Sequence, residues 1–288
     1  MKVVEIDLDF KENFKCENLI LGHFNLIHFG HYKLFSSLKN YSFLIFTNNP
    51  SKQKIPYSLE ERIANIARFN PERIFVYNIL KNNVDPSSFI NNVLKKINPS
   101  TIIVGSDFCF GRNRTGKVDL LKKYFNVIEI KVYKKYSSSK IINLIESGNL
   151  KSANDLMLFN FYYQNKVIKG KGLATKLSIP TANIEDNKQI KIPSGSYASI
   201  TLIDNIPYKS ASFIGIPKSF EINKSFVETH IFNFNCDIYN KLIRVYPVEF
   251  IRENQKFNDI NLLVKAIKSD IEKIKKVLKK INLDTFKF

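Results

Sequence analysis

Apolar and polar residues alternate in a regular way along the first half of the chain. Short apolar runs, each suited to a buried strand, lie at 18–21, 41–47, 73–78, 101–105 and 127–133. Segments with helical spacing separate them, at 29–38, 58–68 and 86–97. Strands and helices that alternate with short links are typical of a parallel sheet with crossover helices. The pattern predicts a doubly wound α/β domain, whose ligands bind at the carboxyl ends of the strands.

The pattern changes in the second half. Turn-forming residues there separate short β-branched, aromatic or alternating runs at 196–203, 210–215, 227–234 and 243–250. We therefore expect a small antiparallel β-barrel or sandwich, followed by a helix at 260–280 with a single apolar stripe. A helix expected at 139–158 closes the first domain. The boundary is expected near residue 157, which gives domains of residues 1–157 and 158–288.

Positive charge dominates the composition. The 288 residues include 44 Lys and Arg against 26 Asp and Glu, a formal net charge of +18, and such an excess is common in nucleic-acid-binding proteins. The lysines are dispersed as pairs, however, and the whole sequence favours Lys, Asn, Ile and Phe, as an AT-rich genome would dictate. We therefore do not expect a nucleic-acid partner, and we interpret the charge as an affinity for phosphorylated small molecules.

Cysteine usage and the lengths of the apolar runs favour a cytoplasmic protein. Cys16, Cys109 and Cys236 are far apart and form no C-x-x-C pair, which argues against a disulfide framework and a zinc site. Each is expected to be a small buried residue. No apolar run approaches the roughly 18 residues of a membrane span, and acids stand where a signal peptide would be apolar. We expect no membrane partner, and the oligomeric state stays open.

The stretch from Gly170 to Asn183 has the composition of a phosphate-binding loop. It begins with closely spaced glycines, Gly170 and Gly172, which let a backbone approach a ligand. It ends in a Pro-Thr-Ala-Asn sequence, in which Thr181 and Asn183 offer the oxygen ligands that a phosphate-bound Mg²⁺ takes. The sequence therefore predicts a phosphate group and a Mg²⁺ ion here.

A second candidate site lies in the turn after the first predicted strand of the α/β domain. Three of the four histidines of the chain are found there, and His28, Gly30 and His31 form an H-x-G-H sequence at the start of a helix. Helix N-termini attract anions, and histidines can donate hydrogen bonds to phosphates and support developing charge. We interpret this turn as a nucleotide site.

This H-x-G-H sequence resembles the signature of the nucleotidyltransferase superfamily. The segment V-G-S-D-F-C-F-G at 104–111 is very close to a segment of the bifunctional bacterial riboflavin kinase/FMN adenylyltransferases, also called FAD synthetases, and S-S-S-K-I at 137–141 resembles another. The similarity spans essentially the whole chain in the family's order. It implies a Rossmann-like nucleotidyltransferase domain and a β-barrel kinase domain, which together convert riboflavin to FMN and FMN to FAD with ATP and Mg²⁺.

The resemblance also implies roles for individual residues. Glu228, in the sequence Val-Glu-Thr-His, would take the proton from the riboflavin 5′-hydroxyl, and His28 and His31 would support adenylyl transfer. Thr181 and Asn183 would bind Mg²⁺ and the ATP phosphates, and Arg252 would pack near the flavin. The other residues implied in nucleotide, flavin or phosphate binding are Gly22, Phe24, Asn25, Gly30, Asp107, Phe108, Ser137, Ser138, Ser139, Gly170, Gly172 and Lys176.

The chain departs from the family pattern at several positions. In the first domain Asn25 stands for an Asp, Asn49 for a His and Ile142 for an Arg, and the glycine-rich loop has Leu173, Ala174 and Ser178 where Arg, Gly and Gly are usual. Two alternatives therefore stay open. One is a riboflavin kinase whose first domain is only a scaffold, and the other is a non-catalytic basic protein that binds nucleotides or RNA.

Overall fold

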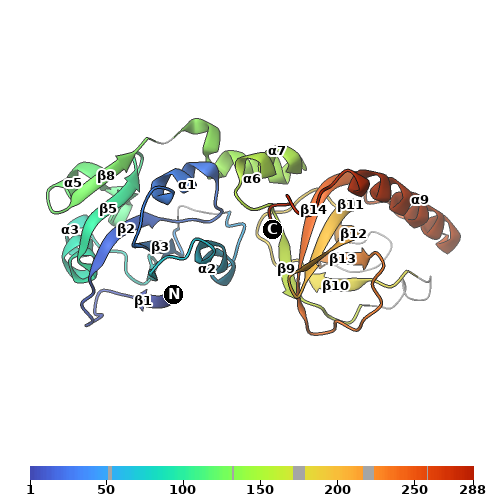
Figure 1. Cartoon of the computed structure of the whole chain (residues 1–288), viewed down its shortest axis with the longest axis horizontal. Helices are drawn as coiled ribbons and strands as arrows, with labels where there is room; N and C mark the ends of the chain where they lie inside the picture. The colour runs from blue at the N-terminus through green and yellow to red at the C-terminus, as the bar shows by residue number, and fades with distance from the viewer. Residues whose placement is uncertain (51–53, 132, 171–178, 217–223, 258) are drawn as a thin grey trace. The chain divides into compact units, whose positions relative to one another are not determined.

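The computed structural model describes residues 1–288 except 51–53, 132, 171–178, 217–223 and 258. The chain divides into two compact units, residues 1–140 and 141–288 (Figure 1). The first has a parallel sheet with helices, and the second has an antiparallel, barrel-like sheet with a terminal helix, so the predicted fold classes are confirmed. The domain boundary that we expected near residue 157 lies within the second unit and stays a proposal.

Six parallel strands form the sheet of the first unit, in the order β1-β4-β3-β2-β5-β8. Their bounds are β1 Lys2–Ile6, β2 Cys16–Gly22, β3 Tyr41–Thr47, β4 Arg73–Asn78, β5 Pro99–Gly105 and β8 Asn126–Ile130. The strand order reverses direction between β2 and β5, which places a topological switch point at the carboxyl end of β2. The edge strand β1 was not predicted, because acids interrupt its apolar pattern.

Short helices connect these strands. Their bounds are α1 Phe29–Phe35, α2 Leu59–Ala67, α3 Pro86–Phe89, α4 Lys95–Ile97 and α5 Val118–Lys122. Ser58 caps α2 with Glu61 as its capping-box partner, as the sequence predicted. The helix expected at 86–97 is interrupted by a π-helical turn, Ile90–Leu94. A small hairpin, β6 Cys109–Phe110 and β7 Gly116–Lys117, and two 3₁₀ turns, Arg112–Arg114 and Lys134–Tyr136, complete the unit.

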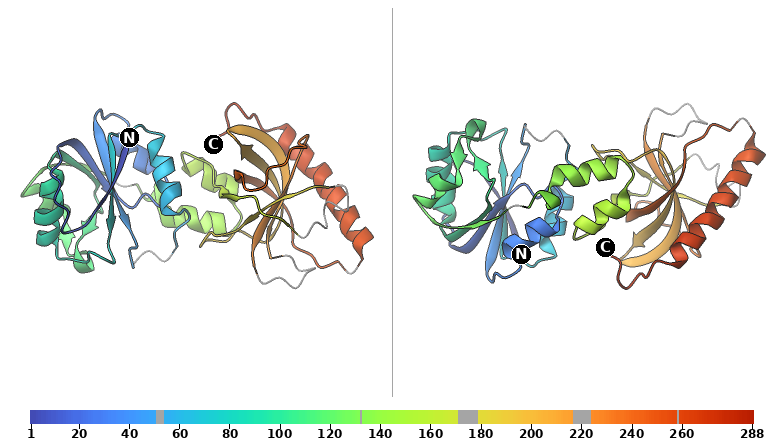
Figure 2. Two further views of the ribbon diagram at one scale, coloured as in Figure 1. Left: turned by 90° about the horizontal axis from the view of Figure 1, so that it is seen from below. Right: turned by 90° about the horizontal axis from the view of Figure 1, so that it is seen from above.

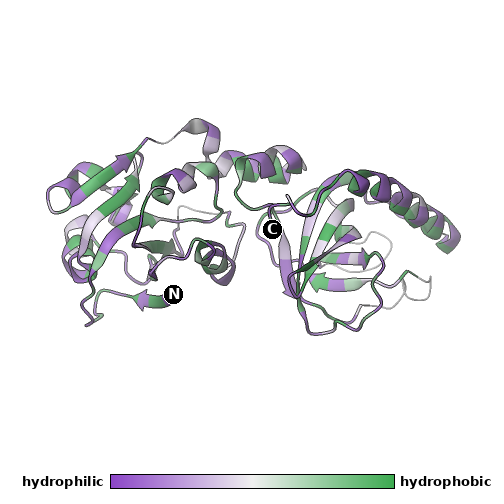
Figure 3. Cartoon of the chain, viewed as in Figure 1, coloured by the Kyte–Doolittle hydropathy of each residue, from purple (hydrophilic) through white to green (hydrophobic). Residues whose placement is uncertain are grey.

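The central strands of the first sheet are apolar on both faces. Leu19, Ile20, Leu44 and Ile45 are at most 1% exposed, and β2, β3 and β5 are mostly green in the hydropathy view (Figure 3). Continuous burial on both sides is what a parallel sheet covered by helices requires. The core therefore supports the strand ends rigidly, and the loops that follow them are free to carry polar residues.

Six antiparallel strands form the sheet of the second unit, in the order β10-β13-β12-β11-β14-β9. Their bounds are β9 Tyr163–Lys166, β10 Ala182–Glu185, β11 Gly195–Ile203, β12 Ile206–Gly215, β13 Phe226–Ile231 and β14 Leu242–Glu253. A bridge between Ile168 and Asn183 links the two outermost strands, so the sheet closes on itself next to the Pro-Thr-Ala-Asn sequence. Tyr162, Tyr163, Tyr197 and Tyr246 are at most 1% exposed in its core.

Among the described residues, three helices belong wholly or largely to this unit: α6 Ser138–Glu146, α7 Leu150–Leu156 and α9 Ile260–Lys279. The single helix expected at 139–158 was wrong, because Gly148 adopts φ 78° and ends the first of two helices there. The terminal helix α9 packs against β11, β12 and β14 and lies along the outside of the barrel (Figure 2). Its buried Ile274 and Leu278 lie on the predicted apolar stripe.

Two further expectations can be compared with the structure. Cys16 is buried, but Cys109 is only partly buried and Cys236 is exposed, so the expectation of three buried cysteines was wrong. Both exceptions lie on segments between strands of the core. Within the described part of the chain, no helix combines the length and the hydrophobicity that a membrane span needs.

Candidate active sites

The H-x-G-H sequence lies at the start of α1, directly after β2. His28 is the N-cap of the helix, and its Nδ1 accepts a hydrogen bond from the backbone N–H of His31 at 3.2 Å. The two imidazole rings stack with their centroids 3.7 Å apart and their planes within 12°. Because Nδ1 of His28 is an acceptor, its neutral ring carries the proton on Nε2. Nε2–H is therefore the atom with which His28 can donate to a phosphate.

Burial keeps both histidines neutral. His28 is 6% exposed, and burial lowers its pKa from 6.5 to about 4. Burial also lowers the pKa of His31 well below 6.5, and the neighbouring His28 lowers it further. The Nδ1 of His31 is buried and has no hydrogen-bond partner among the described residues. His28 thus offers one uncharged donor, and His31 gains a free N–H at Nδ1 when it takes up a proton, which a bound anion would favour by raising both pKa values.

Small and apolar neighbours shape this turn. A side chain at Gly30 would come within 3.0 Å of His28 Nδ1, and one at Gly22 within 2.8 Å of the Phe24 ring. Phe24 itself adopts φ 47° and packs against the His31 ring at 5.0 Å. Asn25 is 7% exposed, and its Oδ1 has no partner in the part of the chain that the structure describes. A carboxylate at this position would be a buried charge, which the amide avoids.

Phe46, near the end of β3, brings two of the predicted segments together. The His23 ring packs on Phe46 with centroids 5.6 Å apart, and the Phe108 ring packs on it at 6.0 Å. The loops after β2 and β5 therefore meet over this ring, as expected for the carboxyl edge of a parallel sheet. Asp107, next to Phe108, is exposed. Asn49 contacts His23 through a hydrogen bond of 2.9 Å between Nδ2 and Nε2.

The serine segment lies next to the H-x-G-H turn. A side chain at Gly30 would approach Tyr136 Cβ within 3.0 Å, and the Tyr136 ring also packs against Phe29. Ser137 follows Tyr136, and its Oγ accepts from the backbone N–H of Lys140 at the start of α6. Ser138 and Ser139 form the first turn of this helix. Ile142, where the resemblance leads us to expect Arg, is 7% exposed and belongs to the apolar side of α6.

Sequence reasoning missed one charged residue near this site. Arg62 on α2 is 3% exposed, and its Nη2 donates to the Phe46 carbonyl at 2.8 Å and to the His23 carbonyl. Both carbonyls lie at the edge that carries the H-x-G-H turn. No pattern in the sequence pointed to Arg62, because an Arg that follows two acids at the start of a helix is typical of a surface residue.

In the second unit, three of the predicted kinase residues, Asn183, Glu228 and Arg252, lie in one row across the sheet. Asn183 on β10 is the register partner of Glu228 on β13, and Glu228 is the partner of Phe213 on β12. The row continues through Ser196 on β11 to Arg252 on β14. Direct partners in an antiparallel pair have Cβ atoms about 5 Å apart on the same face. Asn183 and Glu228 are therefore neighbours, and Arg252 lies three strands beyond Glu228, roughly 14 Å at the usual strand spacing.

The backbone near Asn183 fits closely around its side chain. A Cβ at Gly170 would lie 2.4 Å from Asn183 Nδ2, so a side chain there would displace that amide. The amide Nδ2 points to the Thr181 carbonyl at 3.4 Å, and no described residue donates to Oδ1. His230 bonds through Nδ1 to the Pro180 carbonyl at 2.8 Å, which fixes the residue before Thr181. The predicted residues Gly172 and Lys176 lie outside the described residues, as do Leu173, Ala174 and Ser178.

Burial raises the pKa of Glu228 above its ordinary value. A carboxylate with a raised pKa is a stronger proton acceptor, which suits a general base. Arg252 forms an ion pair with Asp270 on α9, with Nε 3.0 Å from Oδ1 and 2.8 Å from Oδ2. Ser196 donates to the same carboxylate at 2.8 Å. The guanidinium is therefore held in place by α9, and its other side packs over the Phe257 ring.

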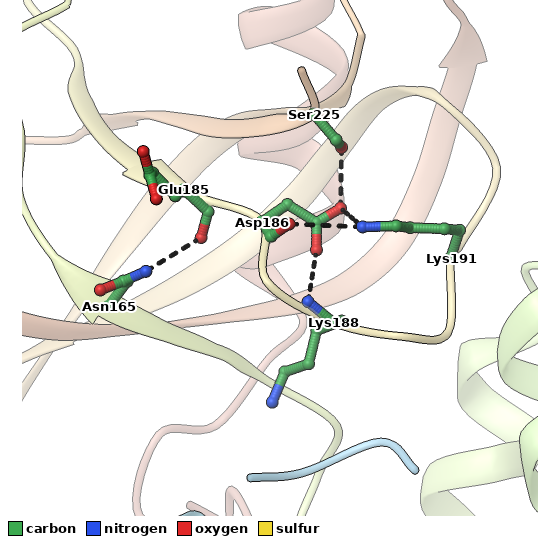
Figure 4. A network of polar contacts seen from close by, with 6 residues as sticks. All are labelled: Asn165, Glu185, Asp186, Lys188, Lys191 and Ser225. Atoms are coloured by element: carbon green, nitrogen blue, oxygen red, sulfur yellow. Dashed lines mark hydrogen bonds and ion pairs between the residues drawn. The ribbon is translucent and has the colours of Figure 1, made fainter. Parts of the chain in front are cut away.

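A network of polar contacts fixes the end of β10, two residues beyond Asn183 (Figure 4). The buried Asp186 accepts hydrogen bonds from Ser225 Oγ at 2.7 Å, Lys191 Nζ at 2.8 Å and the backbone N–H of Lys188 at 3.0 Å. Asn165 donates to the neighbouring Glu185 carbonyl. This network ties β10 to the start of β13, and so supports the register between Asn183 and Glu228.

Comparison with known proteins gives each unit a counterpart. The FAD synthetase family model matches residues 11–147, and the riboflavin kinase family model matches residues 157–278. A bifunctional riboflavin kinase/FMN adenylyltransferase of Buchnera aphidicola subsp. Schizaphis graminum is 32% identical, over 89% of this chain and 92% of the relative. The trifunctional protein RibF/MnmA of Mycoplasmoides gallisepticum is 38% identical over 90% of this chain, which spans 40% of that longer relative.

A solved structure supports the fold of the whole chain. A crystal structure described as a macrolide-efflux protein from Streptococcus pneumoniae matches with a TM-score of 0.80 and 25% identity, over 95% of this chain and 98% of that one. The family expected from the sequence is thus confirmed. This chain belongs to the bifunctional riboflavin kinase/FMN adenylyltransferases, enzymes with both transferase activities, and carries both of the family's domains.

Proposed function

We propose that the second unit phosphorylates riboflavin with Glu228 as general base. The observation that carries this proposal is the register pairing of Asn183 with Glu228, which places a phosphate-side ligand next to a carboxylate of raised pKa. Glu228 takes the proton of the riboflavin 5′-hydroxyl as that oxygen attacks the γ-phosphate of ATP. The row of register partners continues from Glu228 through Phe213 to Arg252. The flavin ring would lie along this row, on the side of Glu228 away from the phosphates.

Thr181 and Asn183 would hold Mg²⁺ together with the ATP phosphates. Hydroxyl and amide oxygens suit this hard cation, which keeps few protein ligands when phosphates supply the others. Asn183 Oδ1, which no described residue engages, is the atom available for it. The ion would neutralise charge on the transferring phosphoryl group. Because Gly170 has no side chain, the Asn183 amide can occupy the space next to it.

The first unit would transfer AMP from a second ATP to FMN, giving FAD and pyrophosphate. His28 Nε2–H and His31 would donate hydrogen bonds to the phosphates, where charge develops during transfer. Their low pKa values leave both rings neutral in the empty turn, so anion binding and proton uptake are coupled. The Asp107–Phe108 loop and the serines at 137–139 meet the same edge and would bind the nucleotide and flavin.

One incubation tests both activities. The purified chain is supplied with riboflavin and MgATP, and the flavins are separated by chromatography. FMN together with FAD supports both proposals. FMN alone would instead match the alternative in which the first unit is a scaffold, to which the departures at Asn25, Asn49 and Ile142 pointed in the sequence. Absence of any phosphorylated flavin would contradict both activities and leave the nucleotide-binding alternative.

The remaining partners follow from this chemistry. We propose riboflavin, FMN and ATP as the small molecules bound, with no nucleic acid or membrane partner. Because both reactions consume ATP, we also propose the cytoplasm as the place of action. The oligomeric state stays open, and size-exclusion chromatography with light scattering measures it directly.

A further inference from the structure

Arg62 is a buried cation that none of the steps above uses. Its Nη2 makes the two hydrogen bonds to the carbonyls of Phe46 and His23, and its Nε is buried without a partner among the described residues. No acidic side chain within the described residues neutralises it, and burial alone lowers its pKa to about 10. The guanidinium is therefore charged at neutral pH and has no counter-ion in the described part of the chain.

Such an arrangement is costly. Burying a charge without a partner of opposite sign is unfavourable. Arg62 is also the fourth residue of α2, near the helix end where the dipole disfavours cations. An apolar side chain would fill the same space without either cost. A role in shape alone therefore does not account for this residue, whereas a role toward an anion does.

The position of Arg62 supports such a role. Phe46 lies near the end of β3, and His23 directly follows the last residue of β2, the neighbouring strand. This edge is the carboxyl end of the parallel sheet, where nucleotides bind in such folds. His23 also opens the turn that leads to His28, and His28 and His31 are themselves uncharged. The fixed positive charge at the base of this turn comes from Arg62.

We propose that Arg62 is a positioning residue of the adenylyltransferase site. It fixes the turn between His23 and His28 through the His23 carbonyl, and its charge favours the triphosphate of ATP and the pyrophosphate product at this edge. This inference rests on the proposed adenylyl transfer in the first unit. Arg62 acts through the turn and through its field, and no contact with the reacting atoms is required.

Two variants of the full chain test the proposal. Arg62→Met removes the charge and both hydrogen bonds, and it should lower kcat/KM for ATP in FMN adenylylation about 100-fold. It should also weaken pyrophosphate binding, measured by calorimetry, about tenfold. Riboflavin phosphorylation by the same preparation should stay within about twofold of wild type. Arg68→Met, at the exposed far end of α2, is the matched control for the change in net charge.

Arg62→Lys separates charge from shape. A buried lysine loses its proton far more readily than an arginine. The variant should therefore bind pyrophosphate and ATP near neutral pH and lose both as the pH rises from about 7 to 9. The wild type should show no such alkaline loss, because its guanidinium stays protonated. A residue that only braces the two carbonyls would give no pH-dependent difference between lysine and methionine.

Two outcomes overturn the proposal. One is that Arg62→Met leaves adenylylation and pyrophosphate binding unchanged, and the other is that Arg62→Lys matches Arg62→Met at every pH. Loss of the first unit's cooperative thermal transition in both variants would mean that Arg62 maintains the fold rather than the anion site. A wild-type chain that forms no FAD contradicts the proposed function instead, and the pyrophosphate titrations then still decide whether Arg62 supports anion binding.

Discussion

The two sites of this chain position their polar residues by different means. In the second unit, Asn183 and Glu228 lie on adjacent antiparallel strands, and the backbone ladder sets their spacing. In the first unit, the polar residues lie on loops that follow parallel strands. Their positions depend on side chains, such as the His28 cap and the Phe46 ring on which two loops meet.

This difference determines how each site should respond to change. Where the ladder sets the geometry, one side chain can be exchanged without moving its neighbours, so effects should be confined to the chemistry. Where side chains hold loops together, a single change alters packing, charge and loop position together. The kinase site should therefore give clean losses of rate, and the adenylyltransferase site should respond to pH and to residues outside the ligand contacts.

The largest expected effect is on the kinase rate of Glu228→Gln. Glutamine keeps the shape of the side chain but cannot accept the hydroxyl proton, so FMN formation should fall about 10²–10⁴-fold. Conversion of added FMN to FAD should be unchanged. Initial rates of both reactions measure this, with Glu249→Gln, an exposed glutamate on β14, as the matched control. A wild-type rate of FMN formation in Glu228→Gln would show that another group is the base.

Acid should destabilise the first unit through His28. Its pKa is about 4 in the folded chain against 6.5 for an ordinary histidine, so between these values the unfolded chain binds a proton that the folded chain does not. Above pH 6.5, the contribution of His28 to the free energy of unfolding therefore does not change with pH. That free energy falls as the pH drops towards 4. The full shift of the His28 pKa corresponds to about 3 kcal/mol in the free energy of unfolding.

Urea unfolding of the first unit at several pH values measures this dependence. His28→Gln, which has no titrating ring, should show a shallower loss of stability in the same window. If wild type and His28→Gln lost stability in parallel, the buried neutral state of His28 would be contradicted.

A smaller effect is expected from Gly170→Ala. The added methyl group would lie 2.4 Å from Asn183 Nδ2 and must displace that amide. The KM for MgATP in the kinase reaction should rise about tenfold, and FMN adenylylation should stay unchanged. A double variant with Asn183→Ala should be no worse than Asn183→Ala alone. Additive losses would mean that Gly170 acts on something other than Asn183.

The smallest expected effect distinguishes two replacements of His230. Asparagine can place an N–H near the position of Nδ1, which bonds to the Pro180 carbonyl at 2.8 Å, whereas glutamine places it near Nε2. His230→Asn should therefore keep most of the Mg²⁺ affinity of the kinase reaction, and His230→Gln should lose about fivefold. The apparent Mg²⁺ constant of FMN formation measures both. Equal losses of Mg²⁺ affinity in the two variants would contradict a positioning role for His230.

The sequence predicted much of the fold because apolar runs and turn residues report strands directly. The Pro-Thr-Ala-Asn sequence and Glu228 were also found, since both belong to recognisable patterns. The sequence did not predict that Asn183 and Glu228 pair, because register depends on which strands become neighbours in space. It missed Arg62 for a related reason, since its burial results from how α2 packs on the sheet, and its neighbours in sequence are exposed or capping acids.

The central claim is that one chain carries two independent sites, one in each unit. Its most direct test is FAD formation from riboflavin and MgATP by a mixture of two inactivated chains, Glu228→Gln and His31→Ala. The first should make FMN only at the strongly reduced rate given above, and the second should stop at FMN. Mixed together, they should make FAD, because FMN released by one chain is adenylylated by the other. As a control, Glu228→Gln alone is supplied with FMN and given the same time to convert it to FAD. If the mixture then accumulated FMN without FAD, the claim would be contradicted.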